Sequence, residues 1–496
     1  MQRKKVVVIG AGFAGLSSAC FLAKYGYEVK VLEKHMMPGG RARQYNVDGF
    51  SFDMGPSWYW MPDVFERFFN QFNRSVSDYY SLTRLDPSYR VYWKDGLTDI
   101  PASYEALKSL FEKIEPGSGL QLDQFLAEAE YKYKVGIGKL VLKPGQEISE
   151  LFDIELIKGL LRLDVFTSMQ KHVARFFNHP HLKQLMEFPV IFLGAMAQDT
   201  PALYSLMNFA DIKGGTWFPK GGMYSIVDAM YELAKSLGVQ FHFEQEAKKI
   251  QVSNQTAKSV ICEDPNGDQN VYQADVVVSN ADYHHTEAKL LEPSYRNYSD
   301  KYWDKRVMAP GCLLYYVGIN KKLENIPHHN LFFDTDFNTH STEIYKTKQW
   351  PSDPLFYACA ASVTEPEVAP YGCENLFFLI PAAAGLTGDT EALRDEYFDA
   401  IISRFERRTH QEIKSNIIFK KSFAHSDFIH EYNAFKGNAY GLANTLLQTA
   451  HLKPSIRNKK IRNLFYTGQL TVPGPGVPPA LISGEVVAAL IKNNFA

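Results

Sequence analysis

Residues 4–34, KKVVVIGAGFAGLSSACFLAKYGYEVKVLEK, carry the pattern that most restricts the fold of this chain. The apolar run at 6–9 predicts a short buried strand. An apolar stripe with helical spacing predicts a helix after it, which Gly26 ends in a left-handed conformation. A second strand follows at 27–32. This order of elements predicts a βαβ unit and therefore an α/β fold with a parallel sheet.

The turn between the first strand and the helix has the form G-x-G-x-x-G. Gly10 permits the tight turn, Gly12 lets the backbone approach a pyrophosphate, and Gly15 lets the helix pack closely on the strand. The helix N-terminus, which includes Ala14, offers free N–H groups and a partial positive charge to the phosphates. Glu33 ends the second strand, where a carboxylate binds a ribose 2′-hydroxyl and repels a 2′-phosphate. The segment therefore predicts a dinucleotide site.

Composition excludes several other classes of protein. The 496 residues carry a formal net charge of -2, which leaves no general basic field for nucleic acid. The five cysteines show no paired spacing, which is typical of a reducing compartment and of neither a disulfide framework nor a zinc site. The first apolar run is too short for a signal peptide, and no stretch approaches the ~18 apolar residues of a spanning helix. We expect a cytoplasmic protein that does not bind nucleic acid.

Two later segments have the pattern of further parts of the same nucleotide-binding sheet. The stretch after residue 223 predicts a helix that ends at Gly238 and a strand at 239–243, which is another crossover onto a parallel sheet. QADVVVSNAD adds a strand at 276–278. Near the C-terminus, a strand at 464–467 runs into a Gly/Pro loop, and a helix follows.

The start of that last helix and the loop before it have their own features. Pro478 and Pro479 suit a first helical turn, because the N–H group that proline lacks has no partner there. Val477 precedes them. Gly468 is followed by Gln469, whose amide can still form hydrogen bonds.

The stretch after Glu33, EKHMMPGGRARQYNVDGFSFDMGPSWYW, separates a flavin enzyme from a nicotinamide enzyme. Gly39 and Gly40 expose backbone N–H groups, and Arg41 offers a charge to a phosphate or to a flavin edge. This segment, with the earlier glycine motif and the C-terminal loop, resembles the flavin-containing amine oxidase superfamily. The resemblance implies that Gly55 and Pro56 approach the isoalloxazine. A surface loop with an unpaired arginine is the alternative.

In that superfamily three more positions acquire roles. The resemblance implies that Ala247 lies near the adenine through its backbone. The N-terminus of the last helix lies against the flavin pyrimidine edge, where reduced flavin gathers negative charge that the helix end stabilises. Relatives often carry an acid at this position to bond the ribityl or ribose chain, and Gln469 departs from that pattern. FAD is the expected cofactor.

The resemblance narrows further at DGFSFDMGPSWYWMPDVFE and TPALYSLMNFADIKGGTWFPKGGM, which look like bacterial carotenoid desaturases of the phytoene desaturase branch. It covers essentially the whole chain. It implies that FAD takes a hydride from an allylic carbon of an apolar polyene while a proton leaves the neighbouring carbon, and that phytoene is converted towards lycopene. The 1-hydroxycarotenoid 3,4-desaturases share the fold and cofactor and are the nearest alternative; SWYWMP is closer to the phytoene-acting branch.

The domains are predicted to be interwoven rather than consecutive. The FAD-binding domain, of Rossmann-like amine oxidase and GDI-like type, is predicted at 1–78, 223–290 and 455–496. A mixed-sheet substrate-binding domain is predicted at 79–105, 205–222 and 291–454, from runs such as GCLLYYVGI and LFFLIPAAAG. A helical insert is predicted at 106–204. The overall class is α/β, or α+β when the insert and the second sheet are included.

The insert has two interpretations. Around 156–163, apolar residues alternate with Lys158 and Arg162, as in a helix that lies in a membrane interface. The pattern favours the other interpretation, a helix packed on the rest of the fold with one solvated face. We nevertheless expect peripheral association with the inner face of the cell membrane, and reoxidation of the flavin by oxygen or a quinone.

Aromatic residues beside the flavin motifs are the candidate walls of a polyene tunnel. A substrate without polar groups is bound by apolar contact, at ~25 cal/mol per Å² buried. The predicted substrate-lining residues are Trp58, Tyr59, Trp60, Trp217 and Phe218. Ordinary core packing explains such clusters equally well. Arg41 and Trp217 are candidates for a catalytic role, and no residue has the features of a catalytic base.

No metal site is predicted. The pairs His284–His285 and His328–His329 lack supporting acids or cysteines in the sequence, and neighbours on one strand point to opposite faces. Three other functions use the same fold: a prenyl-binding escort protein that is not an enzyme, an amine oxidase, and a polyene isomerase or saturase. The intact Gly-Gly-Arg turn and C-terminal loop argue against the escort protein, which has no need of them.

Overall fold

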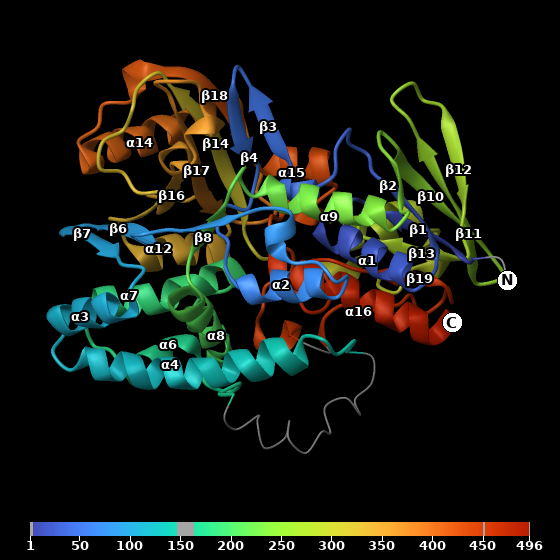
Figure 1. Ribbon diagram of the computed structural model, residues 1–496, viewed down its shortest axis with the longest axis horizontal. Helices are drawn as coiled ribbons and strands as arrows, with labels where there is room; N and C mark the ends of the chain where they lie inside the picture. Colours follow the sequence, from blue (N-terminus) through green and yellow to red (C-terminus); the bar gives the residue numbers. More distant parts are fainter. Residues whose placement is uncertain (1–2, 146–162, 450–451, 496) are drawn as a thin grey trace.

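A computed structural model describes residues 3–145, 163–449 and 452–495. Figure 1 shows a parallel sheet near the two termini, a larger sheet at the opposite end, and a group of helices along one side. The chain passes between these regions several times, so each is assembled from segments that are distant in the sequence.

The parallel sheet has five strands in the order β19-β13-β1-β2-β9. All four pairings are parallel, and the register places Val6 opposite both Val29 and Val276. The strands are β1 (Lys5–Ile9), β2 (Glu28–Leu32), β9 (Gln240–His242), β13 (Val276–Ser279) and β19 (Leu464–Tyr466). The predicted α/β class with a Rossmann-like sheet is therefore confirmed.

Helices α1 (Phe13–Lys24), α9 (Tyr224–Ser236) and α16 (Val477–Phe495) belong to this sheet. Helices α1 and α16 pack against each other. They approach so closely at Gly484 that a methyl group there would lie 2.4 Å from the Ala14 carbonyl oxygen. The Ser17 hydroxyl donates to the Leu481 carbonyl at 2.7 Å. The C-terminal helix is thus fixed against the helix of the glycine motif.

The second sheet has seven strands in the order β18-β14-β17-β16-β15-β6-β7, and only β15 and β6 pair in parallel. Every residue of the interior strand β14 is buried, and α14 (Glu391–Thr409) packs against it through Phe398. The strands are β6 (Tyr89–Trp93), β7 (Gly96–Ile100), β14 (Gly311–Ile319), β15 (His329–Phe333), β16 (Phe356–Cys359), β17 (Glu374–Ala382) and β18 (Ile417–Phe423).

Smaller antiparallel units accompany the two sheets. They are the ribbon β3 (Gln44–Val47) with β4 (Phe50–Asp53), the ribbon β5 (Leu82–Arg84) with β8 (Trp217–Pro219), and the sheet β10 (Glu246–Ser253), β11 (Thr256–Glu263) and β12 (Gln269–Gln273). The Asp53 carboxylate accepts from the N–H groups of Met223 and Tyr224 at 2.7 and 3.0 Å. It thereby ties the ribbon of β4 to the start of α9.

The helices of the insert gather at one side of the molecule (Figure 1). They are α3 (Tyr104–Ile114), α4 (Ser118–Val135), α6 (Met169–Val173) and α7 (Pro180–Glu187). Helix α8 (Leu206–Phe209) follows the insert and packs on α4. The predicted helix around 156–163 lies outside the described residues, except for Leu163, which is buried. Within the described part of the chain, no helix is long and apolar enough to cross a membrane.

The remaining helices are short and lie between the strands. They are α2 (Pro62–Asn70), α10 (Tyr283–His285), α11 (Asp300–Asp304), α12 (Phe337–Thr342), α13 (Ala361–Thr364) and α15 (His425–Tyr432). The strands of the parallel sheet come from 1–78, 223–290 and 455–496, and we propose these segments as the boundaries of the nucleotide-binding domain. In the proposed second domain, 205–222 contributes β8, which pairs with β5 and not with the seven-stranded sheet.

Candidate functional site

A cavity of about 420 Å³ lies at the carboxyl ends of the parallel strands. Gly10 follows β1, Glu33 follows β2, Asn280 follows β13, and Gly468 lies just past β19; all four line the cavity. Ligands of open α/β sheets bind at this edge. The size is within the range of small-molecule sites, about 300–1,000 Å³.

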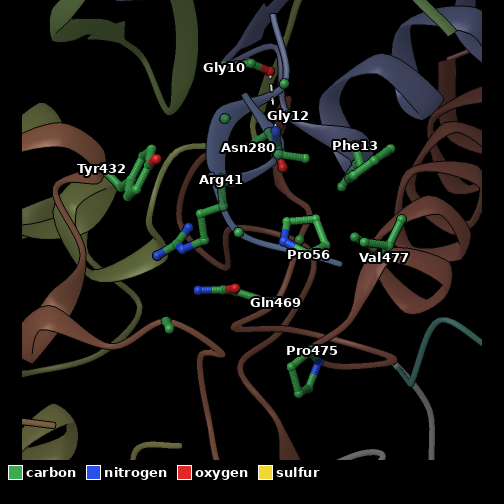
Figure 2. A pocket seen from close by; sticks show the side chains of 18 of the residues that line it. Gly10, Gly12, Phe13, Arg41, Pro56, Asn280, Tyr432, Gln469, Pro475 and Val477 are labelled. Carbon is green, nitrogen blue, oxygen red and sulfur yellow. Dashed lines mark hydrogen bonds between the residues drawn. The ribbon is translucent and has the colours of Figure 1, made fainter. Parts of the chain in front are cut away.

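The glycine turn is held tightly at the entrance of α1. The Gly10 N–H donates to the Leu32 carbonyl at 2.7 Å, and the Asn280 amide donates to the Gly10 carbonyl at 3.2 Å (Figure 2). A methyl group at Gly15 would lie 2.0 Å from the Gly10 carbonyl oxygen. Gly15 does not line the cavity; its role is to let helix and turn approach each other.

Glu33 presents a buried carboxylate at the next turn. It accepts from the Ala11 N–H at 2.7 Å and from the His35 N–H at 3.0 Å. Burial raises the pKa of this carboxyl, and the two backbone donors oppose that rise. A ribose hydroxyl that donates to the same carboxylate adds a third partner, which fits the predicted role of this residue.

The Gly-Gly-Arg turn closes the nucleotide end of the cavity. The Gly39 N–H donates to the Ala11 carbonyl at 2.9 Å, which places this turn on the glycine motif. A methyl group at Gly55 would lie 2.5 Å from the Arg41 carbonyl oxygen, so the Gly55-Pro56 turn passes directly over the arginine. Three turns that are distant in the sequence therefore meet at one place.

The Arg41 side chain lies inside the cavity and points toward Tyr432 and Gln469 (Figure 2). Its guanidinium carbon is 5.2 Å from the centre of the Tyr432 ring, and Nη2 donates to the Asn438 carbonyl at 3.3 Å. Burial lowers its pKa, and the carboxylate of Asp282 opposes that shift. Among the described residues, Arg41 Nε has no hydrogen-bond partner. A buried donor of this kind fits a ligand acceptor.

The C-terminal block forms the other side of the cavity. The Gln469 amide lies 3.1 Å from Arg41 Nη2 when its oxygen faces the arginine. The first residues of α16, from Val477 to Ala480, line the cavity, and Gly476 precedes them. A helix N-terminus that faces a cavity favours negative charge in it. Ala247, at the start of β10, lines the cavity beside Gln245 and Glu246.

Most of the predicted cofactor-binding residues thus lie together around one cavity. Those that line it are Gly10, Gly12, Ala14, Glu33, Gly40, Arg41, Gly55, Pro56, Ala247, Gly468, Gln469, Val477 and Pro478. Their individual roles toward FAD are proposals. The set fits the cofactor, because it joins a glycine cradle, a carboxylate for ribose, a buried unpaired donor and a helix N-terminus.

The predicted substrate-lining aromatics divide into two groups. Trp58 and Trp60 line the cavity, whereas Tyr59 does not. Alternation along an extended segment sends Tyr59 to the other side, where it stacks on Phe65 at 4.5 Å between ring centres. Its hydroxyl lies 3.0 Å from the hydroxyl of Tyr80.

The residues of β8 also lie behind the cavity wall. The indole N–H of Trp217 donates to the Gly214 carbonyl at 2.9 Å, and its ring lies 5.2 Å from the Arg84 guanidinium. Phe218 packs against His328 and borders a smaller second cavity. Because β8 pairs with β5, these rings belong to a supporting ribbon. The position of Trp217 gives no support to a catalytic role.

Several cavity residues were not predicted. Asn280, Asp282, Tyr357 and Tyr432 line the cavity from three separate segments. Asn280 follows the predicted strand at 276–278 directly, so the rule that ligands bind beyond the carboxyl ends of parallel strands could have found it. The others face the cavity only because of tertiary packing.

Of the two histidine pairs, one lies beside a cysteine in the structure and forms a group of potential metal ligands. His284 and His285 lie on the short helix α10, and His328 precedes the strand that begins at His329. The rings of His328 and His329 are 4.5 Å apart, and their nitrogens lie within 4.8 Å of the Cys359 sulfur. Glu128, Asp164 and His172 form a second such group.

The fold and the cavity define a flavin-dependent oxidoreductase. The family model described as flavin containing amine oxidoreductase matches residues 13–492. An oxidoreductase from Methanosarcina mazei shares the fold, with a TM-score of 0.63 and 17% identity over 98% of this chain and 100% of that chain.

Two curated relatives narrow the family. The chain is 41% identical to the carotenoid 3,4-desaturase of Haloarcula japonica over 100% of this chain and 99% of that protein. It is 32% identical to the zeta-carotene-forming phytoene desaturase of Myxococcus xanthus over 98% of this chain and 93% of that protein. The chain therefore belongs to the flavin-containing amine oxidoreductase family, within the carotenoid desaturases. FAD is its cofactor, as predicted from the sequence.

Proposed function

We propose that the protein is a phytoene desaturase, which introduces double bonds into an apolar polyene by hydride transfer to FAD. The observation that carries this proposal is a single cavity that begins at the dinucleotide motif and continues between apolar side chains. Beyond Gly55 and Pro56 these side chains include Met54, Trp58, Trp60, Phe65, Met207, Leu314 and Leu379. An apolar wall of this kind suits a substrate that has no polar group.

The residues around the cavity would position FAD and the polyene and exclude water from both. Bound FAD supplies the hydride acceptor. The turns at Gly12, Gly40 and Gly55 would hold it through backbone groups, and Arg41 would donate to one of its polar atoms from inside the cavity. Trp58 and Trp60 would lie along the polyene and exclude water. Burial of its surface supplies ~25 cal/mol per Å².

A second candidate is desaturation at the 3,4-position of an oxygenated carotenoid. The 41% identity to the carotenoid 3,4-desaturase of Haloarcula japonica favours it. The cavity also contains hydroxyl groups, because the hydroxyls of Ser57 and Tyr357 lie 3.0 Å apart on its wall. Such a pair could bind a substrate hydroxyl. The two candidates share cofactor and reaction and differ only in the substrate.

We also propose that the protein works at the inner face of the cell membrane, where such a polyene dissolves. Phe166 and Leu447 expose 84% and 76% of their surface. Two contacts bring their segments together: the Ala202 N–H donates to the Thr167 carbonyl, and the side chains of Tyr204 and Thr449 are hydrogen-bonded.

The same segments lead to the cavity. Met207, three residues after Tyr204, lines it. We therefore propose this region as the entry for the substrate. Oxygen or a membrane quinone would reoxidise the flavin.

The test is incubation of the FAD-loaded protein with phytoene in liposomes. We expect a red, long-wavelength chromophore, and we expect the double variant Phe166→Ser and Leu447→Ser to float less with vesicles. Tyr371→Ser removes an exposed aromatic elsewhere and is the control. Consumption of a 1-hydroxylated carotenoid in preference to phytoene would assign the second candidate. If the protein consumes neither phytoene nor the 1-hydroxylated carotenoid, the escort protein and the amine oxidase become the favoured functions.

A further inference from the structure

A tyrosine and a histidine form a hydrogen-bonded pair in the wall of the main cavity. Tyr357, on β16, lines the cavity together with Ser57 and Trp58. Its hydroxyl lies 2.6 Å from Nδ1 of His329, on β15, and 3.0 Å from the Ser57 hydroxyl. The two strands are antiparallel neighbours, with Leu331 opposite Tyr357, so His329 lies on the same face of the sheet.

The environment of His329 keeps its imidazole neutral at rest. The side chain is fully buried, and burial lowers its pKa well below 6.5, with neighbouring His328 adding to the shift. One ring face stacks on the Trp58 indole, with 4.1 Å between centres and 4° between planes. An indole face stabilises a cation placed over it. The imidazole can therefore accept a proton briefly without being charged beforehand.

We propose that Tyr357 accepts the proton that the polyene loses and passes its own hydroxyl proton to Nδ1 of His329. This inference rests on the proposed desaturation. One C–H bond of the polyene breaks, and its hydrogen leaves with both bonding electrons as the hydride that FAD receives. The electrons of the neighbouring C–H bond form the new double bond, and that proton moves to the tyrosine oxygen. Tyr357 stays neutral, and His329 becomes an imidazolium until the electron acceptor that reoxidises the flavin takes up its proton.

Three carboxylates of the cavity are less suited to this step. Glu33 and Glu246 lie at the nucleotide end, near the glycine turn and Ala247. The Asp282 carboxylate already accepts from the N–H groups of His285 and Phe435, each at 3.1 Å. A weak base suffices, since an allylic cation is strongly acidic. Tyr357 is the catalytic residue in this scheme because it touches the substrate, and His329 acts through it.

Two of the groups packed behind His329, His328 and Cys359, are uncharged at neutral pH, and the Asp53 carboxylate is charged but bound to the backbone of α9. Burial lowers the pKa of His328 to about 3, and its Nδ1 lies 2.8 Å from the Thr364 hydroxyl. Burial raises the pKa of Cys359 to about 12 and that of nearby Asp53 to about 6. The Asp53 carboxylate is committed to the backbone of α9.

The test is anaerobic reduction of the flavin by phytoene in liposomes, followed through the flavin absorbance. General bases contribute about 10²–10⁴-fold, so Tyr357→Phe should slow this reduction about 100-fold or more, with FAD affinity and dithionite reduction unchanged. The matched control is Tyr92→Phe. Tyr92 lies on β6 of the same sheet and stacks on Phe332, outside the cavity lining. Its removal should leave the rate unchanged.

A second pair of variants separates proton transfer from packing. His329→Gln keeps a hydrogen-bonding side chain that cannot hold the proton, so it should slow flavin reduction without weakening substrate binding. His328→Gln, beside it, should have little effect. The wild-type rate should show no ionisation near pH 6.5, because His329 titrates well below it.

Three results would overturn the proposal. The first is flavin reduction by phytoene at the wild-type rate in Tyr357→Phe or His329→Gln. The second is one bound metal ion per chain in the purified protein that is absent from Cys359→Ser, because His329 would then be a metal ligand. If wild-type protein oxidises neither phytoene nor a 1-hydroxylated carotenoid, the proposed function itself fails, and this inference with it.

Discussion

The two ends of the cavity differ in the groups that form them: mainly backbone groups at one end and side chains at the other. At the nucleotide end, backbone groups and three glycine turns make the site, with Glu33 accepting two backbone N–H groups. At the other end, where we propose that the polyene binds, side chains from β16, α8 and the segment around Trp58 make the wall. The first end depends on local backbone geometry, and the second on how remote segments pack. Substitutions at the two ends should therefore have different consequences.

The largest effect is expected at the glycine motif. Gly15→Ala places a methyl group 2.0 Å from the Gly10 carbonyl oxygen, so helix α1 and the turn must move apart. We expect a cost of about 3 kcal/mol or more, and loss of the flavin absorbance from the purified protein. Gly96→Ala is the control, because nothing lies within 4 Å of its added methyl group. Full flavin content in Gly15→Ala would show that this end tolerates backbone movement.

Glu33→Gln should have the next largest effect. The amide keeps an acceptor but loses the charge, and hydrogen bonds to charged groups are worth about 1.5–3 kcal/mol, a factor of roughly 10 to 150 in Kd. Burial raises the pKa of Glu33 in the free protein, so the carboxylate protonates earlier as the pH falls. Wild-type affinity for FAD should decrease toward acid pH, whereas the variant should be insensitive. Calorimetric titration at several pH values measures both.

At the polyene end we expect a smaller loss of a different kind. Trp58→Ala removes roughly 50 Å² of contact with the substrate, or about 1.3 kcal/mol, and should lower kcat/KM about tenfold with FAD retained. Trp217→Ala should change turnover little, because that indole packs on Arg84 behind the wall. Product formation in liposomes, with flavin content measured in parallel, tests both variants. Equal losses in the two would mean that β8 reaches the substrate.

The smallest effect on function is expected at Lys453, which lies behind the C-terminal loop. Its ammonium has no hydrogen-bond partner among the described residues, and burial lowers its pKa to about 7. Between pH 7 and 10.5 the unfolded chain binds a proton that the folded protein does not, so wild-type stability should rise with pH across this window.

Lys453→Met should raise the melting temperature, most at or below pH 7, and leave FAD affinity unchanged. Thermal denaturation at pH 6 and pH 9, monitored by circular dichroism, gives the comparison. A melting temperature below that of the wild type at pH 6 would show that the ammonium has a stabilising partner.

The fold class was predictable because its evidence is local. The strand at 6–9, the glycine turn and the acid at Glu33 lie within one βαβ unit, and the structure places them as expected. Arg41 was also predictable, since the Gly-Gly-Arg turn follows Glu33 closely. Val477 and Pro478 could be placed because proline marks the first turn of α16.

The polyene wall was predicted less well. Trp58 and Trp60 line the cavity, whereas Tyr59, Trp217 and Phe218 do not. All five are aromatic residues beside flavin motifs, and their types are the same in a core and in a wall. The pairing of β8 with β5 decides the position of the last two. Tyr357 and His329 escaped prediction because their contact depends on the pairing of β15 with β16.

The amino-acid sequence by itself determined the dinucleotide-binding unit, the flavin and the family, because glycine turns and a strand-terminal carboxylate act through the backbone within a few residues. Only the tertiary structure decided which aromatic rings line the cavity and which of its hydroxyls contacts a buried histidine. Those choices depend on sheet pairings between segments that are tens to hundreds of residues apart, and residue type alone carries no record of them.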